Sequence, residues 1–268
     1  RTSYGYSGNI DNSITAFTTM ATTSGNYTNR PALRLINPPN PDLKWEKIAI
    51  ANFGIDFSVF QNRITGSIEY YRKKGDEIIG EIPADPTTGV GSFRGNIAGI
   101  KGSGWDINVS SQNVQGTFSW QTNFMFNVAK DQVTEYLVDP GTFYLFLNAS
   151  INRYPSHASP IVGKPLYSIY SYPWKGLDPE TGDPVGIIEN VESTDYRALS
   201  NYYSDNVDQL IYNGPALPTT FGAIRNTFGY KNFSLSLNIS YHFGGYFRRS
   251  SISYNDFFRS GYYYAHKD

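Results

Sequence analysis

The stretch Ala51–Tyr71, ANFGIDFSVF-QNR-ITGSIEYY, decides the fold class of this chain. In its first nine positions every second residue is apolar, and the residues between them are polar or small. After the polar turn QNR the alternation resumes and continues to the end of the stretch. A period of two over this length predicts two β-strands paired as a hairpin, with one apolar face.

Two further hairpins repeat this pattern. One joins Trp105–Ser111 to Phe118–Val128 through a short polar turn, and the other turns at Lys231-Asn232 before the strand Phe233–Phe243. With a first strand near Arg1–Gly8, the chain is expected to hold about seven spanning strands of about 8–12 residues. That length is close to the 9–11 residues that a tilted membrane strand needs.

Three long segments separate these strands and are expected to be irregular, because they are rich in Pro, Gly, Asn and Tyr. They are Ile10–Lys47, Asp76–Lys101 and Lys130–Thr220. Short turns at one end and long loops at the other are typical of outer-membrane barrels, in which the periplasmic turns are short. If the three tight turns are periplasmic, each long segment begins and ends outside without an extra crossing.

The second face of the strands favours a membrane barrel over a soluble sheet. It carries mainly Ser, Asn, Thr, Gln and Gly, and its charged residues are only Asp56, Glu69 and Asp106. The other charges gather at strand ends: Lys44, Glu46, Lys47, Arg72, Lys73, Lys74, Lys130 and Asp131. A Lys or Arg at mid-membrane costs about 2–4 kcal/mol, which explains this distribution. We therefore predict an all-β fold, an antiparallel transmembrane β-barrel in the outer membrane; a large soluble β-sandwich or solenoid is the alternative.

Composition argues against several other classes. The net charge of −1 does not suit a nucleic-acid binder. The absence of Cys leaves no disulfide framework, thiolate zinc site or cysteine nucleophile. No run of about 18 apolar residues is present, so no transmembrane helix is expected. The 22 Tyr and 17 Phe suit the aromatic girdles of a barrel. Those girdles are expected to contain Tyr70, Tyr71, Trp105, Tyr241 and Phe243 at the outer ends, and Phe60, Phe118, Tyr230 and Phe233 near the turns.

An ordered set of motifs resembles the SusC/RagA family of TonB-dependent outer-membrane transporters. The set begins with NPDLKWEK at 40–47, which leads into the opening hairpin with its GSIEYY at 66–71. The other matches, in chain order, are SYGYSGN at 3–9, the segment 96–106 with GSGWD, FSWQTN at 118–123, GLDPETGDP at 176–184 and the hairpin 221–244. The resemblance covers nearly the whole chain.

The resemblance implies a barrel of about 22 strands with an N-terminal plug and a TonB box. It also implies a SusD-like surface lipoprotein over the barrel mouth and import of oligosaccharides or peptides driven by the TonB system. Residues 1–268 are then expected to form part of the barrel wall, with the plug, the early strands and the closing strands absent.

Two sets of candidate site residues follow. The predicted lumen-lining residues are Asn52, Asp56, Asn108, Gln121, Asn123, Asn127, Ser236 and Asn238. Aromatic residues in the longest loop could stack on a sugar or hold a peptide: Tyr167, Tyr170, Tyr172 and Trp174. For each of these aromatics the alternative, which we favour, is packing of the loop onto the barrel or onto the partner lipoprotein.

No catalytic residue, metal site or cofactor is predicted. Asp178, Glu180 and Asp183 could bind a hard cation, but Pro and Gly among them favour a tight turn. His157, His242 and His266 are scattered without metal-ligand spacing. We therefore predict a non-enzymatic barrel for nutrient import, and the alternative is a structural or adhesive barrel whose loops bind surface partners. A plug and TonB box upstream would favour transport.

Overall fold

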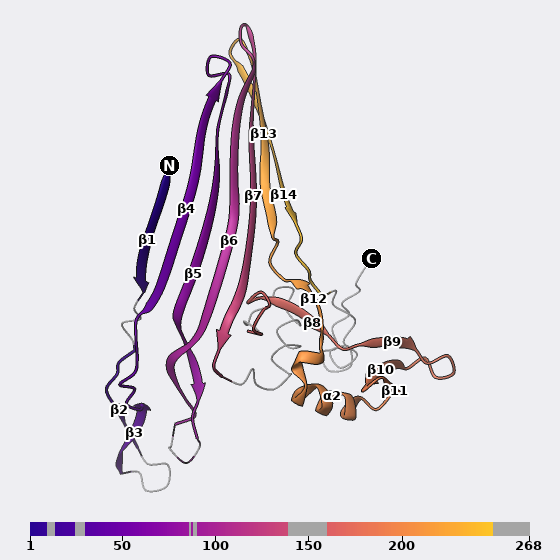
Figure 1. Cartoon of the computed structure of the whole chain (residues 1–268). Coiled ribbons are helices and arrows are strands. Elements are labelled where there is room, and N and C mark those ends of the chain that lie inside the picture. Colours follow the sequence, from indigo (N-terminus) through magenta and orange to yellow (C-terminus); the bar gives the residue numbers. More distant parts are fainter. Residues whose placement is uncertain (10–13, 25–29, 86, 88–89, 139–159, 249–268) are drawn as a thin grey trace.

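The computed structural model describes residues 1–9, 14–24, 30–85, 87, 90–138 and 160–248. Its main body is a seven-stranded sheet in which every neighbouring pair is antiparallel, in the order β1-β4-β5-β6-β7-β13-β14 (Figure 1). The strands span Thr2–Asn9 (β1), Glu46–Val59 (β4), Ile64–Pro83 (β5), Ser92–Val114 (β6), Phe118–Tyr136 (β7), Thr220–Tyr230 (β13) and Phe233–Phe243 (β14). The predicted all-β fold and the seven spanning strands are confirmed.

The three predicted hairpins are also confirmed, and their turns lie together at one end of the sheet, the upper end in Figure 1. In the β4–β5 turn, Phe60, Gln61 and Asn62 have φ angles of 54°, 55° and 65°, and Lys231 between β13 and β14 has a φ of 51°. Left-handed residues of this kind allow a chain to reverse within a few positions. The long connections all lie at the opposite end, as expected.

The prediction that Asp76–Lys101 is irregular was wrong. β5 and β6 continue as a paired hairpin as far as Pro83 and Ser92, so they reach 20 and 23 residues rather than 8–12. Irregularities in the register between Gly75 and Ile79 interrupt the period of two, and a bulge of this kind hides a continuing strand from a pattern search. The sheet therefore extends well beyond the length needed to cross a membrane.

The segment that leads into β4 is held against this extended hairpin. Asn96 accepts a hydrogen bond from the Lys44 amide at 2.8 Å and donates to the Lys44 carbonyl at 2.9 Å. Glu46 accepts from the Ile79 amide at 2.9 Å. Before this segment, β2 (Thr19–Ser24) and β3 (Pro31–Asn37) form a separate hairpin. The predicted irregular segment Ile10–Lys47 thus contains regular structure that its composition did not indicate.

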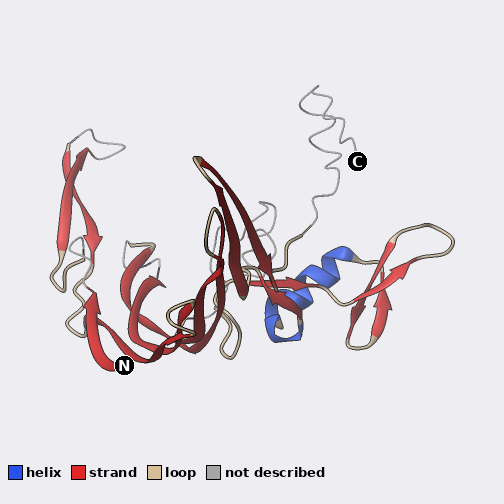
Figure 2. Ribbon diagram, turned by 90° about the horizontal axis from the view of Figure 1, so that it is seen from above, coloured by secondary structure: helices blue, strands red, loops and turns tan. Residues whose placement is uncertain are grey.

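Residues 160–217, between β7 and β13, form a small unit that we call the loop module. Its elements are β8 (Ser168–Ser171), β9 (Trp174–Leu177), β10 (Pro184–Ile188), β11 (Val191–Ser193), α2 (Tyr196–Asp205), η2 (Val207–Gln209) and β12 (Ile211–Pro215). Its buried core consists of Tyr170, Leu199, Tyr203 and Leu210. Seen from above, the sheet is a curved open wall, and the loop module lies beside the edge formed by β13 and β14 (Figure 2).

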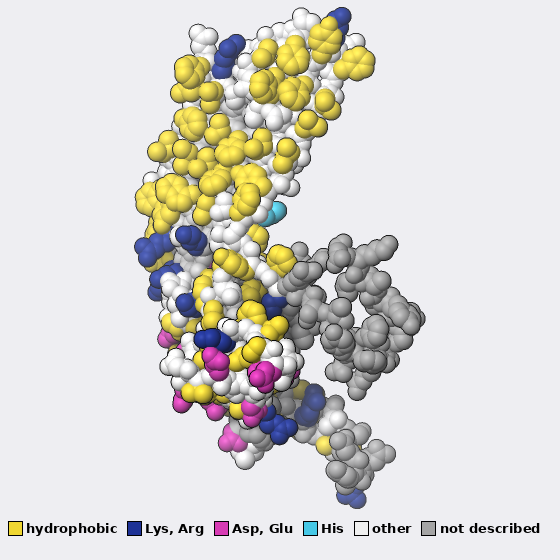
Figure 3. Space-filling model, turned by 90° about the vertical axis from the view of Figure 1, so that its right-hand side faces the viewer, with side chains coloured by type: hydrophobic (Ala, Val, Ile, Leu, Met, Phe, Trp, Pro, Cys, Tyr) yellow, Lys and Arg dark blue, Asp and Glu magenta, His cyan; other side chains and the backbone are white. Residues whose placement is uncertain are grey.

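One face of the sheet, which we call the apolar face, exposes large hydrophobic side chains. Ile55, Leu237 and Ile239 are 68%, 52% and 66% exposed. Figure 3 shows a broad band of hydrophobic side chains over the part of the sheet near the tight turns, with Lys and Arg side chains gathered below it. A face this apolar is stable when lipid rather than water covers it. Within the described ranges, no helix combines the length and the apolarity needed to cross a membrane.

Candidate functional site

The strand pairing brings all eight predicted lumen residues onto the other side of the sheet, which we call the polar face. Two rows of directly paired residues show this arrangement: Asp56–Ser67–Asn108 across β4 to β6, and Asn123–Arg225–Asn238 across β7, β13 and β14. Ser110 pairs with Asn123 and connects the two rows. Directly paired residues share a face, and so do residues two positions apart on one strand. The remaining four follow by this spacing: Asn52, Gln121, Asn127 and Ser236.

Hydrogen bonds between strands hold the centre of the polar face. The Ser110 hydroxyl donates to the Asn123 side-chain oxygen at 2.7 Å, and the Asn127 amide donates to the Phe221 carbonyl at 3.3 Å. A pocket of about 280 Å³ lies beside them, and its lining includes Arg225 and Asn238. This surface offers hydrogen-bond donors and acceptors from Ser, Asn and Arg side chains.

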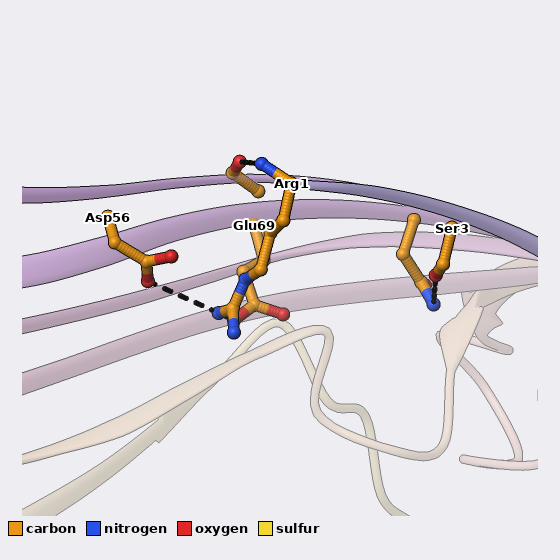
Figure 4. A network of polar contacts seen from close by, with 6 residues as sticks. Arg1, Ser3, Asp56 and Glu69 are labelled. Atoms are coloured by element: carbon orange, nitrogen blue, oxygen red, sulfur yellow. Dashed lines mark hydrogen bonds and ion pairs between the residues drawn. The ribbon is translucent and has the colours of Figure 1, made fainter.

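An ionic cluster lies nearer the first strand. Figure 4 shows the Arg1 side chain extending toward Asp56 and Glu69. The Arg1 guanidinium lies 3.4 Å from the Asp56 carboxylate and is also paired with Glu69. Next to it, the Asn52 amide donates to the Ser3 hydroxyl at 3.1 Å. Because Arg1 and Asp56 are more than half exposed, the pair contributes little stability, and both charges remain accessible from the polar face.

Sequence analysis missed the two arginines of this surface, Arg1 and Arg225. Arg225 occupies a polar-face position of β13, a strand that was identified only by its turn and its partner. Writing out the alternation of β13 would have found it, because Arg225 is spaced by two from Ala223 and Thr227. Arg1 could not be found in this way, since its contact with Glu69 depends on pairing between strands far apart in the sequence.

The aromatic girdle prediction needs one correction. Tyr70 and Trp105 are directly paired on the apolar face, with ring centroids 4.9 Å apart. Tyr71, the next residue, pairs with Asn52 and therefore lies on the polar face. Neighbouring residues of a strand point to opposite sides, so both tyrosines cannot belong to one girdle.

His242 also lies on the polar face, opposite Phe221, whereas His157 and His266 are outside the described residues.

The four loop aromatics lie in different environments. Tyr170 is 2% exposed in the core of the loop module, where burial raises the pKa of its hydroxyl to about 12. Tyr172 packs edge-on against Tyr203 with centroids 5.3 Å apart. Trp174 is 66% exposed on β9, and Tyr167 lines a pocket of about 540 Å³ beside the start of β13. Tyr170 and Tyr172 thus contribute to the packing of the loop module, while Trp174 and Tyr167 stay accessible.

The acidic motif at 178–183 is a hydrogen-bonded turn. One Asp178 oxygen accepts from the Glu180 and Thr181 amides at 2.8 and 2.9 Å, and the Gly182 amide donates to the Asp178 carbonyl. The Thr181 and Glu180 amides hold the pKa of Asp178 below its usual value. The turn interpretation is confirmed. No cluster of three or more potential ligands that could hold a metal ion is found among the described residues.

Comparison with known proteins supplies the family. The model of the TonB dependent receptor-like β-barrel matches residues 1–178. The chain belongs to this family. TonB-dependent receptor barrels are outer-membrane proteins and not enzymes, so the outer-membrane location predicted from the alternating faces is confirmed. The resemblance to SusC and RagA is confirmed as well.

Individual relatives agree with the family. TonB-dependent receptor P3 of Formosa agariphila is 27% identical over 259 residues, which are 91% of this chain and 25% of that protein. TonB-dependent receptor SusC of Bacteroides thetaiotaomicron is 26% identical over 208 residues, 75% of this chain and 20% of SusC. A solved structure described as the RagAB peptide transporter is similar in fold, with a TM-score of 0.71, 21% identity and coverage of 91% of this chain and 26% of that one. The chain thus spans about a quarter or less of these receptors.

Proposed function

We propose that the polar face lines the lumen of a TonB-dependent transporter that imports an oligosaccharide or a peptide across the outer membrane. The observation that carries the proposal is the gathering of all eight predicted residues on one face, opposite an exposed apolar face. When lipid covers one side of a barrel wall, water and solutes contact the opposite side. The relatives named SusC and RagAB support the transport class, and RagAB is described as a peptide transporter.

A surface lipoprotein of the SusD type is proposed as the partner of the loops, with the TonB system as the source of energy. The loop module carries large exposed apolar side chains on β9 and β11, the two strands that flank β10: Trp174, Leu177 and Val191 are each more than 60% exposed. Side chains of this kind on an exposed loop favour contact with another protein. Co-purification of the lipoprotein should fall with Trp174→Asp and remain with Glu180→Gln in the nearby turn.

Uptake measurements test the transport proposal. A strain that lacks the full-length gene should lose uptake of one class of labelled substrate, defined oligosaccharides or defined peptides, and should regain it with the wild-type protein. Asn123→Trp places a large ring on the polar face and so narrows the proposed lumen. This variant should restore uptake poorly even when the amount of protein at the cell surface is normal. Ile239→Trp on the apolar face should restore it fully. Unchanged uptake in the deletion strain, with loss of binding to surface partners, would support the adhesive alternative instead.

A further inference from the structure

Basic residues form an organised group on the apolar face, just beyond the aromatic pair Tyr70 and Trp105. Arg72, Ser103 and Lys130 pair in one row across β5, β6 and β7. The next row contains Lys74, Lys101 and Gln132. Each row lies two residues, or about 7 Å, further along the strands toward the long loops. The cations therefore begin just past the aromatic pair, on the side toward the long loops, and β5 and β6 continue beyond them to Pro83 and Ser92.

These cations line a pocket rather than standing separately. The pocket has a volume of about 410 Å³, and its lining includes Tyr70, Arg72, Lys101, Ser103 and Lys130. Gln132 closes part of one side, because its amide donates to the Gly163 carbonyl at 2.8 Å. Asp131 also borders the pocket, but its carboxylate accepts from the Leu166 amide at 2.8 Å. The lining thus combines an aromatic ring, a hydroxyl and three cationic side chains.

The charges of this pocket are not neutralised within the part of the chain that the structure describes. Arg72, Lys101 and Lys130 are exposed and form no ion pair there, whereas Lys74 pairs with Asp76 at 2.9 Å. Lys74 and Lys101 stand directly opposite each other, an arrangement that like charges disfavour. An anion in the pocket would offset that repulsion and would satisfy several donors at once.

The position of the pocket identifies the anion. Lipid covers the apolar face as far as the aromatic belt, and aromatic side chains mark the level of the headgroups. Outer-membrane barrels have short periplasmic turns and longer extracellular loops, which assigns the pocket to the headgroup level of the outer leaflet. Basic pockets at this level bind anionic lipid headgroups. We propose that Arg72, Lys101 and Lys130, with the Ser103 hydroxyl between them, bind the phosphate of a phosphorylated lipid of the outer leaflet.

Lipid titration of the full-length protein in nanodiscs tests the site. The probe is lipid A carrying two phosphates, and the test variant combines Arg72→Gln, Lys101→Gln and Lys130→Gln. Each basic residue near an anionic lipid surface changes binding by about fivefold, so the triple variant should bind about 100-fold more weakly. Lys73→Gln is the matched control, because Lys73 follows Arg72 on β5 and points to the opposite face. It should bind within about twofold of wild type.

Two further titrations distinguish binding of a lipid phosphate from binding of free phosphate and from binding of the rest of the lipid. Lipid A without phosphates should bind wild type and the triple variant equally weakly, and inorganic phosphate alone should not bind either protein detectably. If the triple variant does not fold, as judged by heat-modified mobility, Arg72→Gln and Lys130→Gln alone should each weaken binding by about fivefold. Equal affinity of wild type and the folded variants for phosphorylated lipid A would overturn the site, as would an equal loss in Lys73→Gln. Tight binding of inorganic phosphate alone would overturn its assignment to lipid.

Discussion

Thr122 and Asn226 lie directly opposite each other on β7 and β13, and the Thr122 hydroxyl donates to the Asn226 side-chain oxygen at 2.7 Å. Both residues belong to the apolar face. The same oxygen accepts from the Trp120 indole at 3.0 Å, and Asn113 donates to the Thr122 hydroxyl at 2.8 Å. Polar side chains that face lipid here bond to one another, because lipid offers them no other partner.

Replacement of Asn226 by Ala should destabilise the barrel. It removes the shared acceptor and leaves the Trp120 and Thr122 donors without their partner, at a cost of about 1–3 kcal/mol. Urea unfolding of the full-length protein in lipid measures the change in the free energy of unfolding. Asn238→Ala, on the polar face of the adjacent strand, is the control and should change stability by less than about 1 kcal/mol, since water replaces the lost amide. Equal losses in both variants would contradict the assignment of Asn226 to the lipid side.

Arginine substitutions at adjacent positions of β14 test the two faces. Leu237→Arg should block assembly in the outer membrane, because an Arg at mid-membrane costs about 2–4 kcal/mol. Ser236→Arg should assemble normally and alter uptake, since its side chain enters the polar face beside Gln121 and Thr227. Assembly is measured by the amount of each variant at the cell surface and by its heat-modifiable electrophoretic mobility. The face assignment fails if both variants assemble equally well.

The wall could be predicted from the sequence because strands such as β14 alternate strictly between apolar and polar residues. In β14, the adjacent residues Leu237 and Asn238 point to opposite faces of the sheet, and the polarity of each side chain matches the face on which it lies. The extension of β5 could not be predicted, because the irregular register between Gly75 and Ile79 breaks that period. The fold of the loop module was also hidden. Its helix depends on an N-cap at Asp195, whose carboxylate accepts from two amides at 3.0 Å, and on burial that only the folded chain reveals.

Single cysteines should label from opposite sides of the membrane when placed at Arg63 and Glu180. Arg63 lies in a tight turn at one end of the sheet, and Glu180 lies in the exposed turn of the loop module. The 268 residues contain no Cys, so the background from this part of the protein is nil. An impermeant maleimide on intact cells should modify Glu180→Cys only, and lysis should expose Arg63→Cys. Labelling of both from outside would refute the assignment of tight turns to the periplasm.

Alkaline pH should loosen the loop module through Tyr170. Burial raises the pKa of its hydroxyl from 10.0 to about 12, so the folded module keeps a proton that the unfolded chain loses. The resulting stability is fully present below pH 10 and falls as the pH rises from 10 to 12. Limited proteolysis within residues 160–217 should therefore accelerate over that interval. The Phe side chain of Tyr170→Phe cannot ionise, so the cleavage rate of this variant should rise less steeply over the same pH interval. An equally steep rise would assign the alkaline transition to other groups.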